Sequence, residues 1–265
     1  MSNLNVRFAD HSDYDFEWGE FGNDDAPMTW GNLREDSGVV RTSLNLFFLL
    51  DTSASMSING SQRINQLNAA MPIALSASRD VAAEKEVDVF VRIISFNSSA
   101  AWVMGSKEKG VPIEDACNKW RGLSAAGSTD TAAAIRLACT AMRAKYMGTR
   151  NYHPVVILVT DGNSNNRTET LNAIEELRNA LSGGNPAKKD KVWRFAIGVE
   201  DNNEAELLDF AMLGTKEDEF GNELPNDPMV FKVDNVNNLV EVLKNVTMGA
   251  INSIRSANGT LLCFW

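Results

Sequence analysis

The feature that most constrains the fold of this chain is an almost unbroken apolar run that ends abruptly in polar residues. Residues Leu44–Leu50 are apolar apart from Asn45, and Asp51, Ser53 and Ser55 follow at alternate positions. A run that is apolar on both faces is typical of a strand buried on both sides, as in a parallel sheet covered by helices. Carboxylate and hydroxyl oxygens in the loop after such a strand suit magnesium or calcium rather than zinc or copper. The sequence therefore predicts a covered sheet with a metal site at one edge.

Strand-like and helix-like segments alternate along the rest of the chain. The strand-like segments span residues 44–50, 87–96, 155–160, 192–199 and 229–233. Helical periodicity of the apolar residues covers 64–81, 131–146, 170–181 and 239–254. Such alternation predicts an α/β fold, a doubly wound and mostly parallel central sheet with right-handed crossovers and helices on both faces.

Two terminal segments fall outside this pattern. The main domain is expected over residues 43–255. Residues 1–42 are rich in aromatic side chains, so we expect an N-terminal extension that packs on the main domain rather than a disordered tail. Residues 256–265 form a C-terminal tail that we expect to attach the chain end to the sheet or core. Neither segment is long enough to bury a core of its own. A partner-docking role is the less favoured alternative for each.

Composition narrows the classes of function. The 265 residues carry a formal net charge of −10, which argues against nucleic acid or an anionic membrane as the main partner. The three cysteines are far apart and only two histidines occur, which argues against a zinc site. The first residues lack the pattern of a secretory leader and no apolar run is long enough to cross a bilayer, so we expect neither a leader nor a membrane span. We therefore expect a cytoplasmic protein in a reducing compartment.

Two further segments bring polar groups to the same edge of the predicted sheet. Asp161 directly follows the strand at 155–160, and Thr129 lies in a Gly-Ser-Thr-Asp-Thr loop ahead of a helix. If the strands that end at Asp51 and Asp161 are neighbours where the strand order reverses, their carboxylates meet in one crevice. Asp130 is expected to cap the helix rather than join the metal. The candidate metal ligands are then Asp51, Ser53, Ser55, Thr129 and Asp161.

These three segments together resemble the metal-ion-dependent adhesion site of von Willebrand factor type A (vWA) domains. They are Asp-x-Ser-x-Ser at 51–55, the Gly-Ser-Thr-Asp-Thr loop at 127–131 and Val-Thr-Asp-Gly at 159–162, within a resemblance that covers about residues 43–254. The resemblance implies that Ser53, Ser55 and Thr129 ligate through their hydroxyls. It implies that the two aspartates act directly or through water. The cofactor is expected to be Mg²⁺, with Mn²⁺ or Ca²⁺ as alternatives.

One residue in the first segment departs from the family pattern. Ala54 stands where the family commonly has glycine. Alanine resists positive φ, so this loop must adopt a conformation that is accessible to an L-residue. All five ligand positions are intact, and metal binding is therefore expected to survive.

The resemblance implies recognition rather than catalysis. A magnesium ion held in this way keeps one coordination position for an Asp or Glu of a partner protein. The segment Leu-Leu-Asp-Thr-Ser-x-Ser-Met at 49–56 also resembles the corresponding segment of intracellular bacterial vWA proteins associated with tellurium resistance. We therefore expect a non-catalytic protein interaction module in a bacterial stress-response or defence complex. A kinase–phosphatase pair or an AAA+ ATPase is the kind of partner that the resemblance implies.

Alternative functions stay open at this point. Asp51 beside magnesium could serve a Mg²⁺-dependent phosphohydrolase, although no lysine stands in a phosphate-anchoring context and no P-loop pattern occurs. Serine hydrolysis is disfavoured because His11 and His153 are the only histidine bases, and His153 begins its strand at the end opposite the site. A scaffold with a vestigial metal site is the remaining alternative.

Overall fold

A seven-stranded sheet forms the centre of the molecule. The computed structural model describes residues 6–7, 43–144, 147, 152–161, 163–185, 191–199, 203–217, 223–255 and 262–263. The sheet has the order β10-β7-β6-β2-β3-β4, and β5 pairs with β3. Its strands are β2 (Ser43–Asp51), β3 (Asp88–Phe96), β4 (Ala100–Met104), β5 (Val111–Pro112), β6 (Tyr152–Thr160), β7 (Trp193–Val199) and β10 (Val230–Val233). All are parallel to their neighbours except β4 and β5, which run antiparallel to β3. The predicted mostly parallel α/β fold is confirmed.

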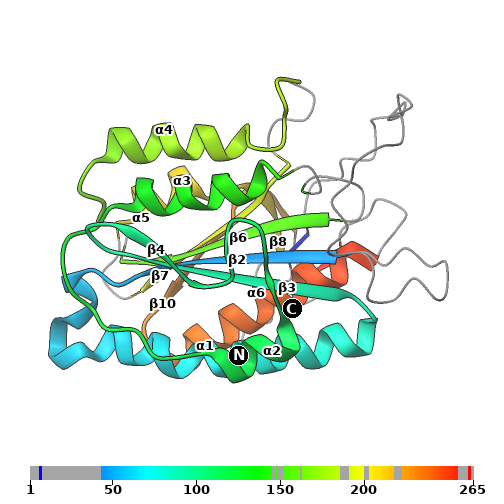
Figure 1. Cartoon of the computed structure of the whole chain (residues 1–265), viewed down its shortest axis with the longest axis horizontal. Coiled ribbons are helices and arrows are strands. Elements are labelled where there is room, and N and C mark those ends of the chain that lie inside the picture. Colours follow the sequence, from blue (N-terminus) through cyan, green and yellow to red (C-terminus); the bar gives the residue numbers. More distant parts are fainter. Residues whose placement is uncertain are drawn as a thin grey trace.

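Helices cover both faces of this sheet (Figure 1). On one face lie α3 (Thr131–Met142), α4 (Arg167–Arg178) and α5 (Glu204–Phe210). On the other lie α1 (Ile58–Lys85), α2 (Ile113–Lys119) and α6 (Val236–Arg255). None of the helices in the described segments is long and apolar enough to span a bilayer.

The helix boundaries differ from the periodicity that predicted them, and the differences at α3 and α4 have a local explanation. The helix expected over 131–146 ends earlier, at Met142, and Arg143 caps it. The helix expected over 170–181 begins earlier, at Arg167, because the Asn166 side chain accepts a hydrogen bond from the Glu169 amide and so caps its first turn. The start of this helix is therefore set by the capping residue and not by the first residue of the apolar periodicity.

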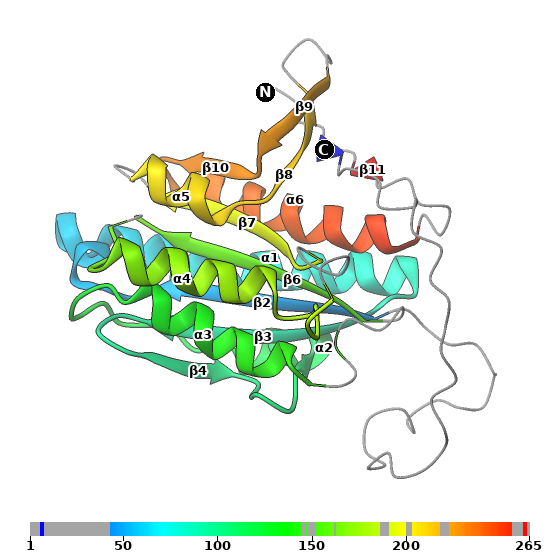
Figure 2. The ribbon, with the colours of Figure 1, turned by 90° about the horizontal axis from the view of Figure 1, so that it is seen from above.

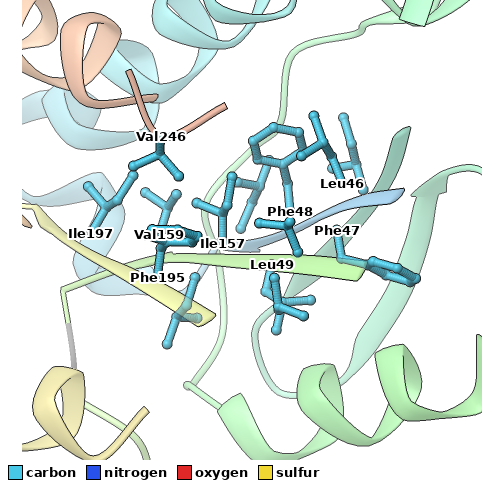
Figure 3. Packing of buried hydrophobic residues seen from close by; sticks show 14 of the residues in the cluster. Leu46, Phe47, Phe48, Leu49, Ile157, Val159, Phe195, Ile197 and Val246 are labelled. Carbon is cyan, nitrogen blue, oxygen red and sulfur yellow. The ribbon is translucent and has the colours of Figure 1, made fainter. Parts of the chain in front are cut away.

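The central strand β2 is buried along its whole length, as its sequence predicts. Figure 3 shows Leu46 and Phe48 on the side of the strand where Val246 of α6 lies, and Leu49 on the opposite side. Successive side chains of a strand point to opposite faces, so an apolar run is needed when helices cover both. This strand and its neighbours β3 and β6 form the middle of the core.

A second, smaller sheet was not predicted. It contains the antiparallel strands β8 (Leu213–Glu217) and β9 (Glu223–Pro228), which extend away from the central sheet (Figure 2). Val6–Arg7 (β1) and Leu262–Cys263 (β11) complete it in the order β11-β1-β8-β9. The polar and proline-containing sequence of β9 carries little strand signal. Apart from β1 and β11, the segments 1–42 and 256–265, for which we expected a packed extension and an attached tail, lie outside the described residues.

The order of the strands creates a switch point between β2 and β6. From β2 the chain passes through α1 to β3 on one side, and β6 later pairs with β2 on the other side. The helices that follow β2 and β6, α1 and α4, lie on opposite faces of the sheet. The loops after the two strands therefore separate and leave space at their carboxyl ends, where ligands of open α/β sheets bind.

Candidate metal centre

Asp51 is the last residue of β2 and is fully buried. The Ser53 amide donates a hydrogen bond to Oδ1 at 2.7 Å, and the Thr160 hydroxyl donates to Oδ2 at 2.6 Å. Burial raises the pKa of Asp51 to about 6; the bonds from Ser53 and Thr160 counteract this, and the negative charge of Asp161 adds to it. Both carboxylate oxygens are thus held in place, and burial disfavours their negative charge until a cation offsets it.

The loop after Asp51 presents two hydroxyls close together. Ser53 Oγ lies 2.9 Å from Ser55 Oγ, and Ser53 is buried while Ser55 is half-buried. Ala54 is exposed and begins the short 3₁₀ helix η2 (Ala54–Ser57). Glu86 is the one described residue other than glycine with a positive φ, so Ala54 is not strained. The prediction that this loop accepts an L-residue is confirmed.

The loop before α3 is joined to the Asp51 loop by backbone hydrogen bonds. The Ala54 amide donates to the Gly127 carbonyl at 2.9 Å, and the Ala126 amide donates to the Thr52 carbonyl at 2.8 Å. Gly127 has a φ of 81°, and a Cβ at this position would lie 2.7 Å from Ser98 Oγ. Only glycine combines this backbone conformation with this close approach.

Thr129 is joined in the same way to the loop after β6. Its amide donates to Asn165 Oδ1 at 3.2 Å, and the Asn165 amide donates back to its carbonyl at 2.8 Å. Thr129 is buried, as is Asp161 at the start of that loop. Asp130 accepts a hydrogen bond from the Ala133 amide at 3.0 Å and caps α3, which confirms the role expected for it.

Asp161 is held much less tightly than Asp51. The Asn163 amide lies 3.5 Å from Oδ1, and Arg63 Nη1 lies 3.4 Å from Oδ2. The sequence analysis missed Arg63. Arg63 precedes the predicted helical periodicity of 64–81 by one residue. In the structure it belongs to α1 and shares a buried stripe with Leu67 and Ala70, which follow at helical spacing.

The structure brings the three predicted segments to the carboxyl ends of β2 and β6 and ties them together. They present two carboxylates and three hydroxyls, which is a donor set for a hard dication. In the described part of the chain no three His, Cys, Asp or Glu side chains gather where they could hold a metal. A metal at this site would therefore depend on the hydroxyls as much as on the aspartates. Such an oxygen donor set suits magnesium or manganese better than zinc, which typically binds nitrogen and sulfur.

The sequence of residues 45–245 matches the family model described as von Willebrand factor type A domain. This chain belongs to the vWA family. The match covers most of the chain and includes all three segments of the candidate metal centre. No curated protein matches the sequence.

Solved structures share the fold of this vWA domain at low sequence identity. Proximal thread matrix protein 1 from the mussel byssus, solved with a zinc-occupied MIDAS motif (the metal-ion-dependent adhesion site), is 18% identical with a TM-score of 0.54; the match covers 80% of this chain and 47% of that chain. A von Willebrand factor type A protein from Catenulispora acidiphila is 15% identical with a TM-score of 0.56, over 80% of this chain and 43% of that one. The manganese-loaded TRAP protein of Plasmodium vivax is 18% identical with a TM-score of 0.51, over 78% and 74%. This vWA chain spans about half the length of the mussel protein.

Proposed function

We propose that this vWA domain is a metal-dependent protein interaction module. One Mg²⁺, with Mn²⁺ or Ca²⁺ as alternatives, would be held by Asp51, Ser53, Ser55, Thr129 and Asp161. Magnesium takes six oxygen ligands and retains water readily, so one position remains for a carboxylate of a partner protein. The zinc and manganese named for the mussel and Plasmodium proteins support a divalent metal here.

One observation carries this proposal: two fully buried aspartates lie at the ends of neighbouring strands, and hydrogen bonds join the loops there that carry the hydroxyls of Ser53, Ser55 and Thr129. The hydroxyls of Ser53 and Ser55 are 2.9 Å apart beside Asp51. Neutral hydroxyl ligands leave more of the positive charge on the metal than carboxylates would. A metal of this kind attracts an external anion, which is what recognition of an acidic side chain requires.

The phosphohydrolase alternative fits the site less well. A nucleophilic Asp51 would have to reach the phosphorus atom directly, but its side chain is fully buried and two hydrogen bonds fix its orientation, whereas a metal ligand can also act through water. Serine hydrolysis also lacks support, because His153 stands at the start of β6 next to Trp193, at the end of the strand away from the site. His11 lies outside the described residues.

The proposal also includes a biological setting and a kind of partner. We place the protein in an intracellular bacterial stress-response or defence complex, with a kinase–phosphatase pair or an AAA+ ATPase as partner. This part rests on the resemblance of the Asp51 loop to vWA proteins associated with tellurium resistance.

Calorimetric titration of Mn²⁺ and Mg²⁺ into the metal-free protein tests the metal site. The wild type is expected to bind one ion, and Thr129→Ala is expected to weaken binding by at least about tenfold because it removes a ligand. Ser128→Ala is the matched control, since this adjacent hydroxyl is exposed and bonds to Ser98. A wild type that binds no divalent ion would overturn the proposal.

Recognition is tested by affinity capture from the native host in Mg²⁺ or in chelator. A partner held in Mg²⁺ is expected to be lost in chelator and with Thr129→Ala, and kept with Ser128→Ala. Retention of the partner under all conditions would favour the vestigial-site scaffold. Hydrolysis of p-nitrophenyl phosphate that disappears with Asp51→Ala would favour the phosphohydrolase.

A further inference from the structure

Arg63 is a buried cation beside the candidate metal ligands. It lies in the second turn of α1, and its side chain is only 7% exposed. Its Nη1 lies 3.4 Å from Oδ2 of Asp161, whose side chain is 1% exposed. A long charged side chain on the buried stripe of a helix is uncommon, because removing its charge from water is costly unless it is compensated.

The contact between Arg63 and Asp161 is loose compared with the contacts of the other aspartate. Asp51 accepts hydrogen bonds at 2.6 and 2.7 Å, whereas the two contacts of the Asp161 carboxylate are 3.4 and 3.5 Å long. A short bidentate arginine pair would take up the oxygens of the carboxylate. The 3.4 Å contact from Nη1 is longer than the contacts in such a pair and leaves the Asp161 carboxylate able to interact with a second cation.

We propose that Arg63 sets the charge of this metal centre and thereby its balance between metal affinity and ligand affinity. The inference rests on the proposed function, namely that a dication binds at Asp51 and Asp161. In the metal-free protein Arg63 offsets the charge of Asp161. A dication held at Asp51 and Asp161 would be repelled by the positive charge of Arg63, so Arg63 would weaken metal binding.

The same positive charge strengthens capture of an acidic partner. Counting only Asp51, Asp161 and Arg63, the site carries a net charge of −1 without metal and +1 with a dication. Without Arg63 the loaded site would be neutral. A positive loaded site attracts an incoming carboxylate more strongly, since interactions between charges are little screened where water is excluded. Arg63 is therefore a residue that tunes specificity for anions, without itself being a metal ligand.

Arg63→Gln tests this inference because it keeps most of the side chain length and removes the charge. We expect Arg63→Gln to bind Mn²⁺ at least about tenfold more tightly than the wild type in calorimetry at pH 8. Its loaded form is expected to bind acetate more weakly. Arg79→Gln is the matched control on the same helix, since Arg79 is 41% exposed and pairs with the neighbouring Asp80. It should leave both affinities unchanged.

The outcomes separate this inference from the proposed function. If the wild type binds no Mn²⁺, the proposed function fails and the inference fails with it. If the wild type binds Mn²⁺ but Arg63→Gln, folded by circular dichroism, binds it no more tightly, the inference alone is overturned, and Arg63 serves only to stabilise the fold. Should Arg63→Gln not fold, Arg63→Lys takes its place. It keeps the charge but not the guanidinium, so we expect near wild-type Mn²⁺ affinity, and an affinity reduced about tenfold or more would overturn the inference.

Discussion

Thr160, the last residue of β6, donates a hydrogen bond of 2.6 Å to Oδ2 of Asp51, the last residue of β2. Both side chains are buried. This bond joins the ends of two parallel strands and fixes the orientation of the carboxylate that opens the metal motif. Residues that hold a ligand in this way affect metal binding almost as strongly as the ligand itself.

Thr160→Val is therefore expected to weaken Mn²⁺ binding by about tenfold, because it keeps the shape of the side chain and removes the hydroxyl. Calorimetric titration measures the change. Thr140→Val is the control, since the Thr140 hydroxyl bonds only to a carbonyl of its own helix among the described contacts. Equal affinities for the two variants would show that Thr160 does not orient Asp51.

The contribution of Asp51 to the stability of the metal-free protein is expected to fall as the pH rises from 3.8 to about 6. The pKa of Asp51 is raised from 3.8 to about 6, so between these values the folded state holds a proton that the unfolded state has lost. The stability that this proton supports is fully present below pH 3.8 and is lost as the pH rises to about 6. The difference corresponds to about 3 kcal/mol at most at pH 7.

Asp51→Asn removes the cost of burying an ionised carboxylate. It is therefore expected to raise the free energy of unfolding by about 1–3 kcal/mol at pH 7, measured by urea denaturation in EDTA. The gain should vanish near pH 4. The same variant should lose metal binding. Asp80→Asn, a change on the surface of α1, is the control. A less stable Asp51→Asn at neutral pH would contradict the prediction.

Gly127→Ala is expected to lower the free energy of unfolding by about 1–3 kcal/mol, because a Cβ at positive φ is strained and would also lie 2.7 Å from Ser98 Oγ. We expect the added Cβ to displace the loop that contains Gly127. This displacement should also weaken metal binding, since the Gly127 carbonyl accepts a hydrogen bond from the Ala54 amide within the metal motif. Gly184→Ala separates the two causes. Gly184 has a φ of 87° but nothing within 4 Å of its added Cβ, so it should lose stability without loss of metal affinity.

Removal of metal is expected to lower the thermal unfolding temperature. A dication that binds the folded state alone stabilises it by about 2.7 kcal/mol at a concentration 100 times its Kd. Differential scanning calorimetry in MgCl₂ and in EDTA should reveal this difference for the wild type. Ser53→Ala is expected to shrink it, whereas Ser182→Ala in the turn after α4 should keep it in full. An equal unfolding temperature with and without metal would count against the site.

Much of the fold could be predicted from local patterns. The run Leu44–Leu50 predicted a strand covered on both faces because its side chains must point into two helix layers. The polar residues after it and after the strand of β6 predicted a shared edge, and the sheet order confirms that β2 and β6 are neighbours. The strand β9 could not be predicted in this way, since its polar sequence pairs with β8 in a small second sheet.

The sequence by itself determined the donor types of the candidate metal centre and the alternation that places them at strand ends. Both follow from residue chemistry and from the period of a strand, which are local properties. Only the tertiary structure decided that Thr160 reaches Asp51 and that Arg63 reaches Asp161. These contacts join residues that are 109 and 98 positions apart in the chain, so they depend on which strands pair and on how α1 packs across them. No local pattern carries that information, because it is set by the packing of the whole sheet.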